Sequence, residues 1–303
     1  MKRTRALLGF LALAWLISLS SSAGAELPAA AKSAIRRFHG KVYLAAKDLK
    51  TGEVLEYSAH EKVQTASVIK VPIMVEVFAQ AFEKRLDLGE ELVVTQENLV
   101  RGSGILQDLS PGLRLSIKDL VVLMITLSDN SATNMLMDRV GIGSVNDRMR
   151  QYGLKNTVLY KKVFKPASEP LPEEQKKWGL GVTTPWDMLM LMEKIYRNEI
   201  MDPAACEAMI EILKKQRDRD QIPRYLLGPR WENVTIANKT GALNQVRNDV
   251  GIVYTPQGNF VLSIFAQDSK DQKWSADNEA TLTLGRMAES LATYFRRKSG
   301  RRP

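Results

Sequence analysis

The sequence predicts a mixed α/β fold of the α+β type, in which an antiparallel sheet is flanked by terminal helices and carries an all-helical lobe. Three observations predict it: strand-like segments lie near both ends of the chain, a long helical region separates them, and a helix closes the sequence. The 303 residues, 45% hydrophobic and 25% charged, have the ordinary composition of one compact domain or two interlocked lobes.

The first 25 residues have the layout of a secretory signal peptide. A basic start at residues 2–5 precedes an apolar run from Ala6 to Leu19, and Ala23-Gly24-Ala25 offers small residues for cleavage. An uncleaved membrane anchor is the alternative, although the run is shorter than the roughly 20 residues that a span needs. We expect residues 1–25 to be removed. The mature chain, 26–303, is then exported to the periplasm or the medium as a monomer without a stable membrane span.

The sheet lobe is expected over about residues 26–62 and 215–303. A helix at 29–38 precedes a β-hairpin, whose alternating strands at 42–47 and 54–58 flank a turn at 48–52. Further strands are expected at 234–238, 249–255 and 260–267, followed by a closing helix at 279–295. Because a lone hairpin is only marginally stable, it should join the late strands in one antiparallel sheet.

The helical lobe is expected over about residues 63–214. Apolar residues recur at helical spacing in 68–82, 117–127, 132–140 and 186–195. Gly141 is typical of a helix end and Pro185 of a helix start. Between the last two helices, residues 165–181 are rich in proline and charge and lack a period. We expect a long loop, which in a compact domain is usually functional or disordered.

Composition excludes several kinds of protein. The single cysteine, Cys206, leaves no internal disulfide, and its apolar helical surroundings predict a buried small hydrophobe. With only His39 and His60, the chain has no cluster of zinc spacing, so we expect neither a metal nor a cofactor, and a Ser-His-Asp triad is disfavoured. No nucleic-acid-binding module is recognisable. The net charge of +9 either favours anionic cell-surface polymers or serves solubility alone.

The first motif is Ser67-Val68-Ile69-Lys70. Residues i and i+3 share one face of a helix, so this spacing places an amine beside a hydroxyl. In apolar surroundings the lysine should have a lowered pKa, and a neutral lysine can accept a proton from the serine. This pattern occurs about once by chance in a chain of this length. Taken alone, it fits an N-cap serine and a surface lysine at least as well.

Two further tripeptides follow in order. Ser128-Asp129-Asn130 lies between two expected helices, where Ser128 can relay a proton to a leaving nitrogen, Asn130 can bind a substrate amide and Asp129 can brace the loop. Helix capping is the alternative. Lys239-Thr240-Gly241 lies at the end of an expected strand. Its lysine and hydroxyl can hold a carboxylate, and its glycine permits close backbone approach, unless it is merely a strand end followed by a turn.

Together the three motifs resemble those of the class A β-lactamase-like serine hydrolases, a family of penicillin-recognising enzymes. Segments 102–106 and 181–185 also resemble the family, so the likeness covers essentially the whole mature chain. It implies the β-lactamase/transpeptidase-like fold and a cleft between the two lobes.

The resemblance also implies roles for individual residues. Ser67 is the acylated nucleophile, Lys70 its base and Ser128 the proton relay. The backbone N–H groups of Ser67 and Ala242 form the oxyanion hole.

Substrate-binding roles follow from the resemblance as well. Lys239 and Thr240 bind the substrate carboxylate, and Asn130 binds the acylamino side chain. Arg224 is expected as a second carboxylate anchor, with Arg247 as its competitor, and either can be a plain surface arginine.

The long loop departs from the family. A Glu-x-x-x-Asn pair there positions the deacylating water, whereas here Glu169-Pro170 is followed by Glu173 in place of the asparagine. The loop glutamates are therefore expected to be solvated charges, and the acyl-enzyme to hydrolyse slowly.

The expected activity is hydrolysis of β-lactam antibiotics through an acyl-enzyme at Ser67. A D-Ala-D-Ala carboxypeptidase-like cell-wall peptidase, or a slowly deacylating penicillin-binding protein, is the alternative within enzymes. A non-catalytic module that binds cell-wall peptides is the alternative from another class, although binding alone needs no activated serine.

Overall fold

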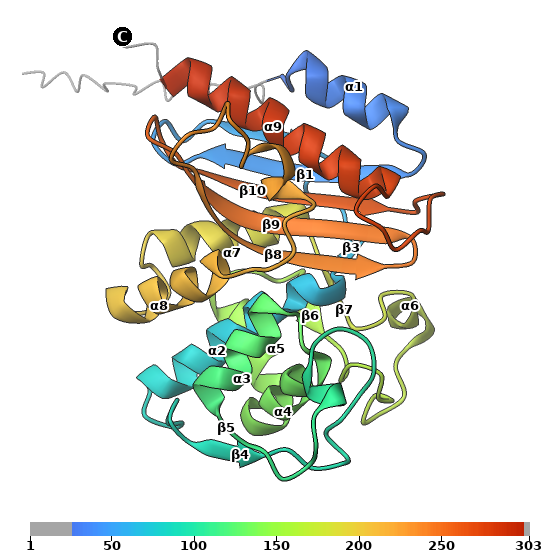
Figure 1. Cartoon of the computed structure of the whole chain (residues 1–303), viewed down its shortest axis with the longest axis vertical. Helices are drawn as coiled ribbons and strands as arrows, with labels where there is room; N and C mark the ends of the chain where they lie inside the picture. The colour runs from blue at the N-terminus through green and yellow to red at the C-terminus, as the bar shows by residue number, and fades with distance from the viewer. Residues whose placement is uncertain (1–25, 300–303) are drawn as a thin grey trace, which may run out of the picture.

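A computed structural model describes residues 26–299 of the chain (Figure 1). The α-helices are α1 (Ala29–Arg37), α2 (Lys70–Phe82), α3 (Ile117–Thr126), α4 (Asn130–Val140), α5 (Ile142–Gln151), α6 (Glu173–Lys176), α7 (Pro185–Tyr196), α8 (Pro203–Lys214) and α9 (Glu279–Ser299). Short 3₁₀ helices are η1 (Ala66–Ile69), η2 (Leu106–Asp108) and η3 (Ile222–Tyr225). The strands are β1 (Lys41–Asp48), β2 (Val54–Tyr57), β3 (Val63–Gln64), β4 (Glu91–Val93), β5 (Arg114–Ser116), β6 (Val158–Leu159), β7 (Gly181–Thr183), β8 (Thr235–Leu243), β9 (Val246–Tyr254) and β10 (Phe260–Gln267).

The main sheet joins the two ends of the chain, as predicted. Its strand order is β2-β1-β10-β9-β8, and every pair is antiparallel. Strand β1 pairs with β10 from Lys41 opposite Gln267 to Asp48 opposite Phe260. The early hairpin is therefore completed by strands from the last quarter of the sequence, and β8 is left as an edge strand.

The sheet is covered on both faces (Figure 1). Helices α1 and α9 lie side by side on the outer face, above a core that includes Leu44, Leu262 and Leu291. Helix α7 packs against β1, β9 and β10 on the inner face. A second core continues from there into the helical lobe, around α2. Because both faces are covered, all eight residues of β10 are buried rather than alternately buried and exposed.

The helical lobe lies below the sheet in Figure 1 and is built around α2. Eleven of the thirteen residues of α2 are buried, because α3, α4, α5 and α8 pack around it. Gly141 ends α4 with a φ of 86°, and Pro185 is the first residue of α7, as predicted. Cys206 is fully buried in the apolar face of α8, which confirms its prediction as a core residue.

The expectation of an all-helical lobe is wrong in one respect. Strands β3, β7 and β6 form a three-stranded sheet, and β4 pairs with β5. These strands have only two or three residues each, so they are too short to show an alternating pattern in the sequence. The first of them matters for the site, because β3 directly precedes the turn that carries Ser67.

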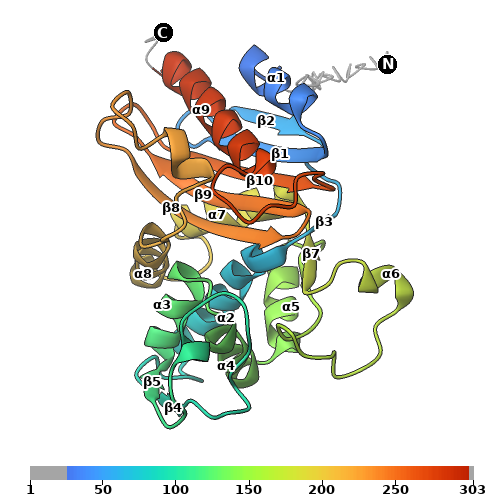
Figure 2. The same ribbon diagram turned by 45° about the vertical axis from the view of Figure 1, so that its right-hand side comes forward.

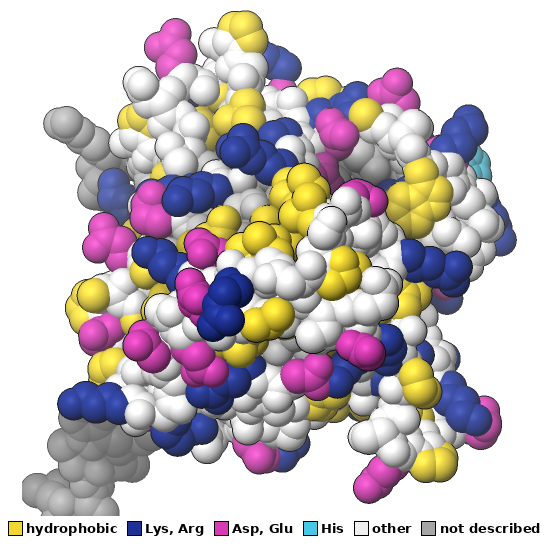
Figure 3. Space-filling model, turned by 60° about the horizontal axis from the view of Figure 1, so that its bottom comes forward, with side chains coloured by type: hydrophobic (Ala, Val, Ile, Leu, Met, Phe, Trp, Pro, Cys, Tyr) yellow, Lys and Arg dark blue, Asp and Glu magenta, His cyan; other side chains and the backbone are white. Residues whose placement is uncertain are grey.

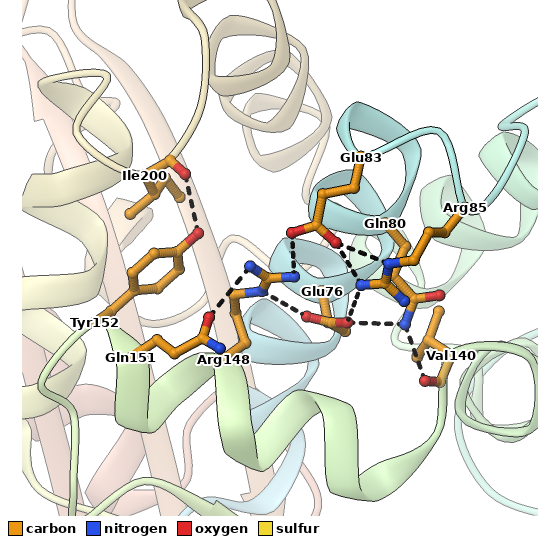
Figure 4. A network of polar contacts seen from close by, with 9 residues as sticks. All are labelled: Glu76, Gln80, Glu83, Arg85, Val140, Arg148, Gln151, Tyr152 and Ile200. Carbon is orange, nitrogen blue, oxygen red and sulfur yellow. Dashed lines mark hydrogen bonds and ion pairs between the residues drawn. The ribbon is translucent and has the colours of Figure 1, made fainter.

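Buried charge also holds the helical lobe together, between α2 and α5 (Figure 4). The carboxylate of Glu76, whose side chain is 1% exposed, accepts hydrogen bonds from Arg148 Nε at 2.8 Å and from Gln80 Nε2 at 2.8 Å. Arg148 also donates to Glu83 Oε1 at 2.7 Å. This pairing satisfies a charge that would be costly to bury alone.

Candidate active site

A cleft of about 500 Å³ opens between the two lobes. Residues from both lobes line it: Ser67, Ser103, Thr126, Leu127, Ser128, Gln216, Arg217, Asp218, Asp220, Gln221, Thr240, Gly241, Ala242, Arg247, Trp274, Ser275, Ala276 and Thr281. All three sequence motifs contribute to this wall, although they lie far apart in the chain. The cleft also borders the open edge of β8, where a substrate backbone can add to the sheet.

Ser67 lies in the 3₁₀ helix η1, which leads into α2. Ala66, directly before it, has a φ of 45°, a conformation that costs a non-glycine residue of the order of 1–3 kcal/mol. The buried side chain of Asn248, on β9, secures this turn by donating to the carbonyl oxygens of Gln64 at 2.8 Å and Thr65 at 3.1 Å. The nucleophile candidate is therefore held by the sheet as well as by its own helix.

Gly241 brings β8 against the same turn. A Cβ atom at this position would lie 2.9 Å from the carbonyl oxygen of Thr65 and 3.0 Å from the backbone nitrogen of Ser67. These are backbone atoms that a side chain cannot displace cheaply. The glycine thus allows the strand edge to touch the turn, as predicted for its motif.

Lys70 is fully buried at the start of α2, which excludes a surface lysine. Its Nζ donates to Ser128 O at 2.7 Å, Ser128 Oγ at 3.1 Å and Asn130 Oδ1 at 2.9 Å. Burial lowers the pKa of Lys70 well below its usual value, the nearby charge of Lys239 lowers it further, and Asp129 opposes the shift. A lysine in this state is suited to accept a proton at neutral pH.

Ser128 connects the two lysines. Its hydroxyl accepts from Lys70 Nζ and, also at 3.1 Å, from Lys239 Nζ across the cleft. Its φ of 55° is again unusual for a serine and turns the side chain between α3 and α4. This hydroxyl therefore lies on a path of hydrogen bonds that runs from one lobe to the other.

Asp129 braces the loop, as predicted. Its Oδ1 caps α4 by accepting from Ala132 N at 2.9 Å. Its Oδ2 accepts from the backbone nitrogens of Ile105 at 2.7 Å and Leu106 at 2.8 Å. The aspartate thereby ties the segment around residues 102–106 to the turn that presents Ser128.

Asn130 is the first residue of α4 and is mostly buried. Its amide oxygen accepts from Lys70, and its amide nitrogen donates to Arg101 O at 3.1 Å. One amide hydrogen remains for a substrate group. Asn130 thus orients Lys70, in addition to the substrate-binding role expected for it.

The third motif lies inside β8 rather than at a strand end, because β8 continues to Leu243. Lys239 is fully buried, and burial lowers its pKa to about 8 against the opposing charges of Asp218 and Asp249. Thr240 and Ala242 line the cleft on either side of Gly241. Ser67 and Ala242 both line the cleft.

The two arginine candidates differ in position. Arg224, on η3, is not among the residues that line the cleft, and its guanidinium donates to Ala276 O at 2.7 Å and Asp277 Oδ1 at 2.8 Å. Arg247 does line the cleft. However, it donates to the carbonyl oxygens of Leu243, Val246 and Lys273, so it fastens the end of the β8–β9 hairpin.

Glu169 lies on the long loop, which stands away from the helical lobe around α6 (Figure 2). It is exposed and does not line the cleft. Glu173 pairs with Lys176 within α6, also at the surface. The loop therefore offers no glutamate to the cleft, in line with the expectation of solvated charges.

Several residues of the cleft wall carry no sequence signal. Trp274 is 67% exposed at the rim, stacked on Arg247 with the guanidinium carbon 4.8 Å from the ring centre. Asp218 lies close enough to Lys239 and Arg247 for its charge to oppose the lowering of their pKa values by burial. Both residues lie in irregular segments without a motif, and their position depends on the fold alone. Within residues 26–299, no group of three His, Cys, Asp or Glu side chains is placed to hold a metal ion.

Comparisons with known proteins agree with this geometry. Residues 26–295 match the family described as the beta-lactamase enzyme family. Beta-lactamase BRO-1 from Moraxella catarrhalis is 23% identical over 226 residues, which cover 73% of this chain and 69% of that protein. The crystal structure of a beta-lactamase from Sphaerobacter thermophilus superposes with a TM-score of 0.78 at 28% identity, covering 88% of this chain and 95% of that one.

A further similar structure is that of PBP-A, with a TM-score of 0.75 at 27% identity, covering 88% of this chain and 96% of that one. A mutant of PBP-A has been solved as an acyl-enzyme complex with penicillin G.

Proposed function

Because this chain belongs to the beta-lactamase enzyme family, we propose that it is a class A-like hydrolase whose Ser67 opens the amide of a β-lactam and is acylated by it. One observation carries the proposal. The hydroxyl of Ser128 lies 3.1 Å from both Lys70 Nζ and Lys239 Nζ, in a cleft that Ser67 also lines. This pattern provides a base, a proton relay and a cation for a substrate carboxylate around one serine.

The proposed acylation moves one proton in a cycle. Neutral Lys70 takes the proton of the Ser67 hydroxyl, and Ser67 Oγ attacks the β-lactam carbonyl carbon. The negative charge that develops on the carbonyl oxygen is stabilised by the backbone N–H groups of Ser67 and Ala242. When the C–N bond breaks, Ser128 gives its proton to the leaving nitrogen and recovers one from Lys70.

Substrate binding is proposed to use both sides of the cleft, β8 and the start of α4. The ammonium of Lys239 and the hydroxyl of Thr240 hold the substrate carboxylate, while the free amide hydrogen of Asn130 binds the acylamino group. Arg247 is now the better candidate than Arg224 for a neighbouring role, because Arg224 lies outside the cleft lining. The guanidinium of Arg247 already donates hydrogen bonds to three carbonyl groups. We therefore propose that Arg247 shapes the cleft by holding the β8–β9 hairpin and Trp274.

A slowly deacylating penicillin-binding protein is the second candidate. It is favoured by the exposure of Glu169 outside the cleft. The similarity to PBP-A, a mutant of which is known as a penicillin G acyl-enzyme, is consistent with it. In this case acylation proceeds as above, and the ester at Ser67 persists. A non-catalytic binding module is disfavoured, since binding alone needs no buried lysine beside a serine.

We also propose that the mature protein begins at Glu26 after export and acts as a monomer in the periplasm or outside the cell. The segment that carries the export signal, residues 1–25, lies outside the described residues. Among the described residues, no helix is long and apolar enough to span a membrane. Mass determination of the protein recovered from the periplasm or medium tests the cleavage site, and its size in solution tests the monomer.

The decisive experiment is intact-protein mass spectrometry after addition of penicillin G. The wild-type protein should gain the mass of one intact penicillin molecule, since ring opening releases nothing. Ser67→Ala should gain none. Ser103→Ala removes a hydroxyl from the same cleft and should still be labelled. A labelled Ser67→Ala protein would contradict the assignment of the nucleophile.

A further inference from the structure

Residues of α1 and α9 line a second, basic depression. These two helices lie on the outer face of the sheet, away from the helical lobe (Figures 1 and 2). The volume of the depression is about 810 Å³. We call it the α1–α9 groove, and it is lined by Pro28, Ala29, Ala30, Ser33, Ala34, Arg37, Arg230, Arg286, Glu289, Ser290, Thr293, Tyr294, Arg297 and Lys298. None of these residues takes part in the proposed chemistry.

The charge of this groove is unbalanced. Four arginines and one lysine line it, against a single acid, Glu289, which pairs with Arg230 at 2.6 Å. Lys298 pairs with Glu53. Across residues 26–299, Arg37, Arg286 and Arg297 form no ion pair. By contrast, acidic and basic side chains alternate over the face that carries the helical lobe (Figure 3).

The arginines are spaced along the groove rather than clustered. Arg286 and Arg297 lie on the same helix and are separated by three turns, which corresponds to about 16 Å. Between them, the floor consists of small and hydroxyl-bearing side chains, namely Ser33, Ser290 and Thr293. Guanidinium groups bind phosphate oxygens with paired hydrogen bonds, and hydroxyls donate to the same oxygens. A row of phosphates fits this arrangement better than one isolated anion.

The side chains that line the groove also indicate which kind of molecule could supply such a row of phosphates. None of the exposed large apolar side chains of the described residues lines the groove, so it lacks the residues that insert into a lipid bilayer. Its one aromatic side chain, Tyr294, is half-buried, donates its hydroxyl to Glu53 Oε1 at 2.7 Å and has the ammonium of Lys298 over its ring. It therefore does not offer the open ring face on which the bases of single-stranded nucleic acids stack. What remains is a linear phosphodiester chain without bases, such as a polyol phosphate.

We propose that the α1–α9 groove binds a linear polyol-phosphate polymer through Arg37, Arg286 and Arg297. Helix α9 contributes Thr281 to the cleft and residues 286–298 to the groove, but the two share no lining residue, so a bound polymer leaves Ser67 uncovered. Binding would hold the enzyme on an anionic matrix while Ser67 remains accessible to small substrates. The proposal does not depend on the identity of the nucleophile, and it can fail without affecting the proposed function.

The test measures binding of poly(glycerol phosphate) to the full chain by titration calorimetry at low salt. Arg286→Gln/Arg297→Gln should weaken binding by about 30-fold, since one arginine near an anionic surface contributes roughly fivefold. The control variant Arg114→Gln/Arg150→Gln removes the same net charge from exposed arginines of the helical lobe. Its affinity for the polymer should differ from that of the wild type by less than about twofold. Raising the salt concentration should weaken the wild-type complex steeply. Acylation by penicillin should be unchanged in both variants.

Four results would overturn the proposal. Absence of binding would show that the groove is not a polymer site. Equal weakening in the two double variants would show that the polymer is attracted by net charge alone. Tighter binding of an oligothymidylate of similar length would identify a nucleic-acid site instead. Tighter binding of phosphatidylglycerol vesicles would identify a membrane surface.

Discussion

At the scale of single residues, Gly241 determines how closely the sheet approaches the Ser67 turn. We expect Gly241→Ala to lower the rate of acylation by about 10²–10³, the effect of losing one oxyanion donor. The reason is that the new methyl group would lie 3.0 Å from the Ser67 nitrogen and push the turn away from Ala242. Rapid mixing with a chromogenic cephalosporin measures this rate.

Gly143→Ala is the matched control for that experiment. Gly143 lies within α5 with open space around its Cα, so the substitution introduces no contact. It should leave acylation unchanged and raise the stability of the helix slightly. An unchanged acylation rate in Gly241→Ala as well would show that the strand and the turn are not in the contact described.

Lys239 predicts an alkaline limit to substrate binding. Its pKa of about 8 lies below the usual value, so the ammonium is present at pH 7 and is lost as the pH rises through 8. The apparent dissociation constant for penicillin should therefore rise between about pH 8 and 9. The acylation rate of the bound complex should not fall over this range, because Lys70 is then more fully neutral.

A penicillin methyl ester is the control, since it has no carboxylate for Lys239 to hold. Its binding should not weaken over the same range of pH. If both compounds lose affinity together, the titration belongs to another group or to the fold, and Lys239 is not the carboxylate anchor.

Three short sequence motifs predicted most of the residues that meet at the site. The spacing of Ser67 and Lys70 and the residues of the two tripeptides predicted the groups that meet around Ser128. The support from more distant parts of the chain was not predictable. Asn248, from β9, secures the Ser67 turn next to Ala66, whose φ of 45° is unusual for a non-glycine residue. Arg224 was chosen by likeness of its segment, which says nothing about the direction of its side chain.

At the scale of elements, the long loop around α6 is expected to control the lifetime of the acyl-enzyme. With Glu169 exposed outside the cleft, no loop carboxylate is placed to activate a water at the ester. We expect the wild-type acyl-enzyme to accumulate with most penicillins. We also expect Glu169→Gln to change its lifetime by less than about tenfold, well below the effect of a committed base.

The measurement is the decay of the acyl-enzyme mass after excess drug has been removed. Glu173→Gln, on the same loop, gives the matched control and should behave like Glu169→Gln. Rapid decay in the wild type, together with a trapped Glu169→Gln acyl-enzyme, would show instead that the loop closes over the cleft and that Glu169 is the base.

The contact between α2 and α5 depends on the pair of Glu76 and Arg148 (Figure 4). Arg148→Met would leave the carboxylate of Glu76 buried without its hydrogen-bonded cation, since the other one, Arg85, lies 3.7 Å away and is half-exposed. We expect it to lower the free energy of unfolding by about 3–5 kcal/mol. Urea denaturation, with the slope compared between variants, measures this loss.

Arg150→Met is the control on the same helix. Arg150 is 59% exposed by its side chain and pairs with Asp147 at the surface, so its loss should cost about 0–1 kcal/mol. A double variant, Glu76→Gln with Arg148→Met, should regain part of the stability because it removes the stranded charge. Equal stability of the two arginine variants would contradict the role given to Glu76.

Elements with a clear period were predicted well, and those set by tertiary contacts were not. Strand β10 was predicted over its full length, 260–267, because a dense apolar run begins directly after the turn at 256–259. Strand β8 was predicted to end at Asn238 but continues to Leu243, since pairing with β9 carries polar residues into the ladder. The strands β3 and β7 depend on each other and leave no local pattern.

At the scale of the whole molecule, the arrangement of two lobes followed from the order of its parts. The order of strands, helical insert and further strands predicted one sheet built from both ends of the chain. The antiparallel pairing of β1 with β10 confirms this prediction. The charge distribution was not predictable, because α1 and α9 are remote in sequence and their arginines meet only in the folded protein. The sequence supplied the excess of positive charge but not its position.

The same pairing governs the order in which the protein can fold. Strand β1 has its inner neighbour only once residues 260–267 have been synthesised, and closing so long a loop delays the central contacts of the sheet. The Ser67 turn is made early, yet its anchor Asn248 and its neighbour Gly241 arrive late. A nascent chain that lacks the last strand thus contains every motif in linear form but no assembled cleft. We therefore expect acylation of Ser67 only after synthesis is almost complete.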